Sequence, residues 1–242
     1  MTAQDRTERR QGKDVRSDML IVEDLMLLML DDETGTPSGA GTLHYALGGA
    51  VLVELALLGR VETDGGGPWL NGPKVRPAGD GPLPDPLLQS AYDKVAERTQ
   101  RVQPLLLDIG AGLWKLMIDR LVERGLIRRE SRRVLGLFRT TRLPSDDPRH
   151  EAELRRKIRA VLEDGETPDP RTAAVIALLS SSGTLPALRP PLPWSGLVRE
   201  RAKRLEQGNW GAEAVNAAVV RTAAGIAASS AAVSVTVITT TT

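Results

Sequence analysis

Two stretches near the N-terminus are apolar around almost the whole circumference of a helix. They cover residues 19–30 and 42–58, and a glycine suited to a C-cap follows the second at Gly59. A helix that is apolar on every side is normally buried. We therefore expect both helices at the centre of the fold, and the paired glycines of residues 48–49 indicate close packing of the second helix against another helix.

Farther along the chain, amphipathic helices alternate with short strand candidates. Helices are predicted over residues 90–98, 104–124, 149–162, 171–179, 195–206 and 210–227. The Gly- and Pro-rich residues 61–86 predict a small hairpin or flap, and residues 126–129 and 133–140 predict two strands joined around 130–132. The fold class is thus mainly α, a single globular multi-helix domain with a small β-hairpin or two.

The two ends of the sequence differ in composition from the middle. Residues 1–18 alternate charges without an apolar run, which predicts a disordered tail and no secretory signal. The last uncharged run has the length of a membrane span, but its Ala, Ser and Thr transfer poorly to lipid. We expect a folded domain over residues 19–228 and a loose tail over 229–242.

Composition narrows the possible chemistry. In the 242 residues, 41% are hydrophobic, 26% are charged and the net charge is +1, so attraction to a polyanion must come from local clustering. There is no cysteine and there are only two histidines, which excludes thiolate chemistry and histidine-rich metal sites. We expect no metal and no cofactor, and a location in the cytoplasm.

Enzymatic activity is not expected. The remaining enzyme hypothesis is a carboxylate-dependent hydrolase that uses Glu54 or Asp31, yet neither has a visible acid–base partner in the sequence. A buried structural hydrogen bond is the commoner role for a carboxylate such as Glu54. The glycines of residues 35–41 follow a helix and lack a Gly-Lys-Ser/Thr continuation, so they predict a plain loop.

Residues 115–142 carry the strongest local charge, with nine basic and three acidic side chains. Apolar residues lie next to these arginines in the sequence, as in a surface that touches anionic lipid and enters the acyl boundary. The residues predicted to contact anionic lipid are Arg128, Arg129, Arg132 and Arg133. Those predicted to insert into the membrane, or to contact a second subunit, are Leu135, Leu137 and Phe138.

Other interpretations of this hairpin remain open. It could pack against its own core or form a homo-oligomer contact. The order of helix then basic hairpin also fits a winged-helix nucleic-acid-binding protein, although an apolar tip is of little use to a DNA-binding wing. We therefore expect nucleic acid to be an unlikely partner.

Three segments resemble the Golgi phosphoprotein 3 family (the GPP34-type domain) in order and spacing. They are residues 20–30, 49–60 and 121–126, and the resemblance extends from about Met19 to Arg221. It implies a mostly helical single domain and a bacterial-type member. Eukaryotic members of the family are peripheral membrane adaptors: they bind phosphatidylinositol 4-phosphate with a Trp and several Arg, insert a hairpin, and hold glycosyltransferase tails.

The sequence departs from the family at the lipid-binding positions. The family's Trp and three Arg fall at about Gly39, Gly48, Ala111 and Trp114. This puts specific phosphatidylinositol 4-phosphate recognition in doubt, and leaves His44, Trp114 and Lys115 as candidates for a remodelled headgroup pocket. The predicted function is a peripheral adaptor on the inner face of the membrane, with anionic lipid and a client protein tail as partners.

Overall fold

The computed structural model describes residues 19–31, 34–64, 73–134, 138–210 and 221–230, and their side chains except those of 131–140. Helices dominate these residues and form one mainly α domain, which confirms the predicted fold class. The predicted tail at 1–18 lies outside the described residues, and so does the predicted tail at 229–242 except for its first two residues. Residues 221–230 are helical, and the buried Ser229 and Ser230 belong to this helix.

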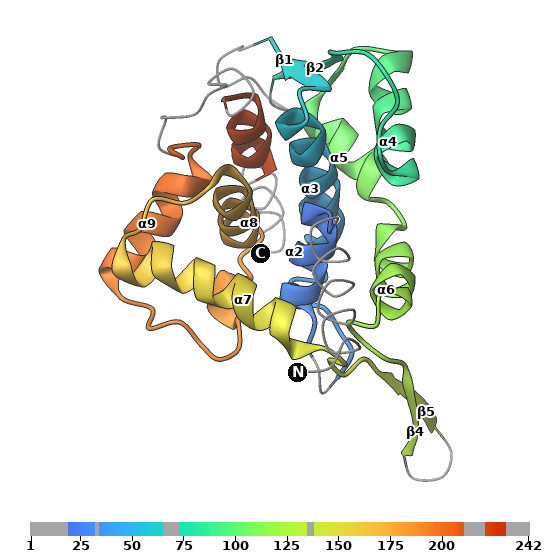
Figure 1. The fold of residues 1–242 in the computed structure, drawn as a ribbon, viewed down its shortest axis with the longest axis vertical. Helices are drawn as coiled ribbons and strands as arrows, with labels where there is room; N and C mark the ends of the chain where they lie inside the picture. The colour runs from blue at the N-terminus through green and yellow to red at the C-terminus, as the bar shows by residue number, and fades with distance from the viewer. Residues whose placement is uncertain (1–18, 32–33, 65–72, 135–137, 211–220, 231–242) are drawn as a thin grey trace, which may run out of the picture.

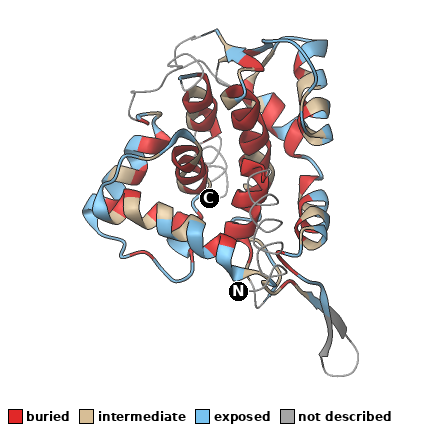
Figure 2. Cartoon of the chain, viewed as in Figure 1, coloured by how far each residue is buried: buried red, intermediate tan, exposed pale blue. Residues whose placement is uncertain are grey.

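The centre of the molecule consists of α2 (Ile21–Met29) and α3 (Leu43–Leu57), as predicted. Every residue of α2 is buried, and so is most of α3, including Leu47, Leu52 and Leu55. Figure 2 shows these two helices in the buried class along nearly their whole length. Other helices cover α2 and α3 on several sides, so apolar side chains around almost the whole circumference of both helices are buried.

Two groups of helices cover this centre (Figure 1). On one side lie α4 (Pro86–Glu97), α5 (Val102–Gly110) and α6 (Leu113–Glu123). On the other lie α7 (Pro148–Arg159) with its π-helical continuation η1 (Ala160–Asp164), α8 (Pro170–Ser181) and α9 (Gly196–Glu206). A 3-10 turn, η2 (Leu185–Ala187), follows α8.

Three of these helices have the same N-terminal capping arrangement. Asp85, Asp147 and Asp169 each accept a backbone hydrogen bond as the N-cap, and a proline occupies the first helical position. Proline has no N–H to leave unsatisfied there. Helix α4 therefore starts four residues before the predicted Ser90.

The predicted single helix over residues 104–124 is wrong. It is divided into α5 and α6 at Ala111, whose backbone is extended, and at Gly112, whose φ is +78°. A left-handed φ costs little only at glycine. Both halves bury leucines on one face, so their apolar pattern continues across the break.

Helices α3 and α5 approach each other unusually closely. A Cβ at Gly48 would lie 2.2 Å from the carbonyl oxygen of Leu106, and one at Gly110 would lie 1.8 Å from that of His44. Neither position can hold a side chain without displacing backbone. This confirms the close packing expected from the paired glycines.

The strands form two separate antiparallel sheets. Strands β1 (Val61–Thr63), β2 (Lys74–Pro77) and β3 (Gln100–Arg101) pair in that order. The β1–β2 pair confirms the predicted hairpin. The second sheet contains β4 (Glu130–Val134) and β5 (Phe138–Arg142) and follows α6 in the chain.

Candidate functional site

The β4–β5 hairpin is the part of the fold that leaves the helical body (Figure 1). Its root is fixed because Leu126 and Ile127 are buried, Ile127 bridges Ser145, and Arg128 donates its N–H to the carbonyl of Pro144 at 3.1 Å. The described strands extend outward from this anchored base. They therefore present a two-stranded ribbon to whatever lies beside the molecule.

The register of the hairpin corrects the predicted strands. Val134 pairs with Phe138 and Glu130 with Arg142, so the connection lies at residues 135–137 and not around 130–132. Residues 126–129 precede the ribbon. A charged run such as Glu130–Arg132 is typical of a turn, but the strands of an exposed ribbon can also carry charged residues.

The predicted lipid-contact residues divide into two groups. Arg128 and Arg129 lie at the root, with side chains that are 52% and 51% exposed. Arg132 and Arg133 belong to β4, paired with Thr140 and Arg139, but their side chains lie outside the described part of the structure. The same holds for Phe138, and Leu135 and Leu137 lie entirely outside it.

Nearby carboxylates partly neutralise the root arginines. Arg128 contacts Glu130 at 2.8 Å and Asp146 at 2.9 Å, and these hydrogen bonds raise the pKa of Arg128. Arg129 pairs with Asp119 on α6. Both guanidinium groups stay exposed to solvent, so they remain accessible to an anionic surface.

Two members of the basic stretch point inward instead. Arg120 and Arg124 both bind the fully buried carboxylate of Glu23, at 2.8 and 2.9 Å. Arg120 also binds Asp85 at 2.6 Å; burial alone would lower its pKa, but the hydrogen bonds to Asp85 and Glu23 raise it. The surface charge is thus smaller than the local sequence count predicts.

The candidate headgroup residues lie near the break between α5 and α6. His44 is the second residue of α3 and is half-buried, its ring centroid is 4.3 Å from that of Tyr45, and burial lowers its pKa. Trp114 is half-buried against the core, whereas Lys115 is exposed. Among the described residues, no hydrogen bond or ion pair joins these three side chains.

Two of the four positions that correspond to the family's phosphoinositide residues, Gly39 and Gly48, offer little room for a larger side chain. Gly48 faces the α5 backbone, as described above, and Gly39 has a φ of +70° with Thr184 Cγ2 only 2.6 Å from a built Cβ. Ala111 is exposed and forms the extended break before α6. The structure thus gives a steric reason for glycine at positions 39 and 48.

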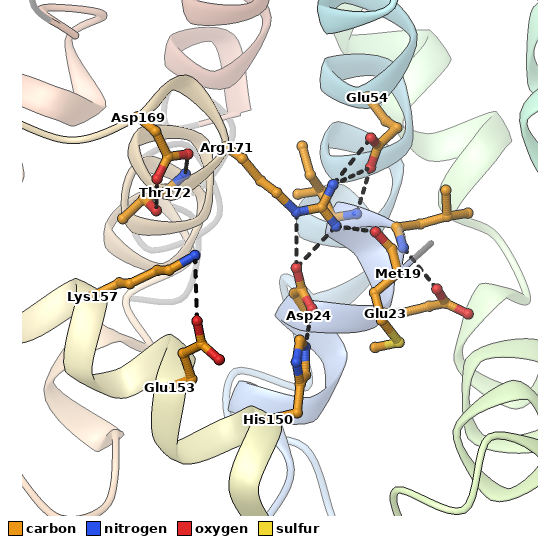
Figure 3. A network of polar contacts seen from close by, with 12 residues as sticks. Met19, Glu23, Asp24, Glu54, His150, Glu153, Lys157, Asp169, Arg171 and Thr172 are labelled. Carbon is orange, nitrogen blue, oxygen red and sulfur yellow. Dashed lines mark hydrogen bonds and ion pairs between the residues drawn. The ribbon is translucent and has the colours of Figure 1, made fainter. Parts of the chain in front are cut away.

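A second cluster of charges, not predicted from the sequence, surrounds the start of α2 (Figure 3). Arg171 on α8 binds Asp24 at 2.9 Å and Glu54 at 3.2 Å, and also donates to the carbonyl of Met19. His150 on α7 contacts the other oxygen of Asp24 at 2.7 Å. We call Glu23, Asp24, Glu54, His150 and Arg171 the α2 clasp.

Within the α2 clasp, Glu54 fills the structural role that the sequence favoured over catalysis. Its Oε2 accepts the N–H of Ile21 at 2.5 Å, while Glu23 accepts the N–H of Leu20 at 2.7 Å. Burial raises the pKa of Glu54, and the charge of Arg171 opposes that shift. The two carboxylates satisfy N–H groups that the first turn of a helix leaves without partners.

The other enzyme candidate, Asp31, accepts hydrogen bonds from the backbone N–H and the hydroxyl of Thr34, at 2.8 and 2.9 Å. The described residues contain no group of three His, Asp or Glu placed to hold a metal ion. Among the same residues, no helix combines the length and hydropathy needed to cross a bilayer.

A comparison with protein-family models places most of the chain in one family. The model of Golgi phosphoprotein 3 (GPP34) matches residues 21–222. The match begins at α2, includes both sheets and every named helix, and extends into the helical residues 221–230. The chain therefore belongs to the Golgi phosphoprotein 3 (GPP34) family.

Proposed function

We propose that this protein is a peripheral membrane-binding adaptor that meets anionic lipid through the β4–β5 hairpin. The observation that carries the proposal is the projection of the hairpin backbone from the helical body, on a root anchored by Leu126 and Ile127. A protruding ribbon can reach a bilayer without any change in the core. Family membership supports the same class of function.

The chemistry of the ribbon supports a membrane as its target. The exposed Arg128 and Arg129 lie at its root, and the sequence between Val134 and Phe138 is Leu-Gly-Leu. Each basic residue near an anionic membrane contributes about 1 kcal/mol, and large apolar side chains add to that when they enter the acyl boundary. We infer weak electrostatic attraction followed by insertion of the tip.

Recognition of the lipid headgroup is proposed to be general. Gly39, Gly48, Ala111 and Trp114 supply no guanidinium fork for a phosphomonoester, in contrast to the family pattern given above. The proposed location is the cytoplasmic, inner face of a membrane. As an adaptor, the protein would hold the tail of a client protein there, without catalysing a reaction.

Co-sedimentation with vesicles tests this proposal. The purified protein should pellet with vesicles that contain phosphatidylglycerol or phosphatidylserine, should pellet much less with pure phosphatidylcholine, and should be released by salt. A gel-shift lane with duplex DNA at the same salt concentration tests the winged-helix alternative. Binding to DNA but not to anionic vesicles would replace the membrane proposal.

A further inference from the structure

A groove of about 650 Å³ lies beside the end of α2, and neither Arg128 and Arg129 of the hairpin root nor His44, Trp114 and Lys115 line it. The apolar side chains of Leu28, Leu30 and Leu188 line it together with the charged Asp31, Arg155 and Arg189. This volume lies within the range of about 300–1,000 Å³ that is typical of small-ligand sites.

Hydrogen bonds hold both walls of the groove in place. On one wall, Arg159 of α7 donates to the carbonyl groups of Pro190 and Pro191, each at 3.0 Å. On the other, Ser38 donates its N–H to Met29 at 2.7 Å, and Leu30 forms a β-bridge with Pro37. The groove is therefore preformed, which lowers the entropic cost of binding.

The two arginines of the groove have unused hydrogen-bonding capacity. Arg155 forms an ion pair with the buried Glu151 at 2.5 Å, and its Nε is buried without a hydrogen-bond partner. The Arg155 side chain is 22% exposed, so a guanidinium N–H on its exposed part can donate to an acceptor in the groove. Arg189 is 73% exposed and lies 3.7 Å from Asp31, which is too long for a strong hydrogen bond.

Leucine side chains beside two guanidinium groups are suited to a ligand that has both an apolar part and an anionic group. We propose that the groove binds a small organic acid, with its carboxylate at Arg155 and Arg189 and its apolar body on Leu28, Leu30 and Leu188. A planar carboxylate suits guanidinium donors better than a hydroxyl or an amine does. The proposal is independent of membrane binding, because no predicted lipid-contact residue lines the groove.

Three probes with the same apolar body test the ligand class. They are 4-phenylbutyrate, 4-phenylbutanol and 4-phenylbutylamine, titrated at millimolar concentrations into the isotope-labelled full chain and followed by amide NMR shifts. The butyrate should shift the amides of Ala187 and Arg189 saturably, with at least about tenfold tighter binding than the alcohol. Equal affinity for acid and alcohol, or no saturable shift with the acid, would overturn the proposal.

Four variants test the position of the site. Ala187→Trp fills the exposed groove wall without changing any charge, so it should abolish binding of the acid. Arg155→Gln and Arg189→Gln should each weaken it by about tenfold, while the exposed Arg199→Gln on α9, outside the groove, should not.

The groove variants also define the results that would contradict the proposed site. Undiminished binding in Ala187→Trp would overturn the proposal. Arg155 also pairs with the buried Glu151, so Arg155→Gln can fail to fold. In that case the exposed Arg189→Gln is the test, and undiminished binding of the acid in this variant would contradict the site. Vesicle binding by Ala187→Trp should equal that of the wild type, so the outcome here is separate from that of the membrane proposal.

Discussion

At the scale of single residues, the α2 clasp shows how an apolar helix accommodates buried carboxylates. Glu23, Asp24 and Glu54 occupy an apolar centre, and each has a basic partner from another element. Removing one member of such a group leaves an uncompensated charge, which costs more than the pair contributes. The clasp therefore fixes the start of α2 relative to α3, α7 and α8.

Arg171→Met should lower the free energy of unfolding by about 2 kcal/mol, as measured by urea denaturation. The value lies below that of a fully buried pair because the Arg171 side chain is 36% exposed and solvent screens part of the interaction. Arg199→Met, on the exposed face of α9, is the control and should change stability little. A loss as small as that of the control would show that the clasp does not stabilise the fold.

The raised pKa of Glu54 predicts a pH dependence with a definite sign. The folded state holds this proton more tightly than the unfolded chain, whose Glu pKa is 4.5, so the contribution of Glu54 to stability is fully present below that value. It is lost as pH rises through the folded pKa. The stability of the wild type minus that of Glu54→Gln should therefore decrease from pH 4 to pH 7. An increase over that range would refute the shift.

At the scale of elements, glycine determines how closely α3 and α5 pack. Gly48→Ala should destabilise the protein by about 3 kcal/mol, because its Cβ would overlap the backbone of Leu106 at 2.2 Å. Gly225→Ala is the matched control in a helix, with no heavy atom within 4 Å of the new Cβ. The control should stabilise the protein by about 0.5–1 kcal/mol. Thermal unfolding of the two variants should shift in opposite directions, and similar shifts would contradict this packing.

Sequence patterns located most elements but not their exact ends. The buried α2 and α3 were predictable because their apolar runs are long and Gly59 follows the second. The break at Gly112 was not, because the leucine periodicity continues on both sides of it. The predicted ends of the hairpin strands were also wrong, because charged residues occur both in turns and in exposed strands.

The ion pairs of the buried carboxylates join residues that are far apart in the sequence, which is why the sequence alone did not predict them. Glu23 and Arg120 are 97 residues apart, and Asp24 and Arg171 are 147 apart, so local charge counting treated Arg120 as a surface residue. Acidic residues inside an otherwise apolar run were the available signal, because buried charges need partners. The α2 clasp could have been suspected on that ground, although its partners could not have been named.

At the scale of the whole molecule, the helical body and the hairpin have different roles in the account. In the proposed function, the helical body is the base from which the hairpin contacts lipid. Vesicles with 5% phosphatidylinositol 4-phosphate should bind the protein no more tightly than vesicles of equal charge made with phosphatidylserine, because Gly39, Gly48, Ala111 and Trp114 provide no fork for the phosphate. A clear preference in a titration at matched charge would contradict general headgroup recognition.

The most direct test of the membrane proposal is co-sedimentation of two hairpin variants with anionic vesicles over a range of salt concentrations. Replacing Leu135, Leu137 and Phe138 with Ser removes apolar groups that contribute about 1.5–3 kcal/mol each when fully buried, so binding should fall sharply at every salt concentration. Replacing Arg128, Arg129, Arg132 and Arg133 with Gln should weaken binding mainly at low salt. If the Ser variant binds vesicles like the wild type, or instead loses an oligomeric state in light scattering while vesicle binding persists, the hairpin tip does not contact lipid.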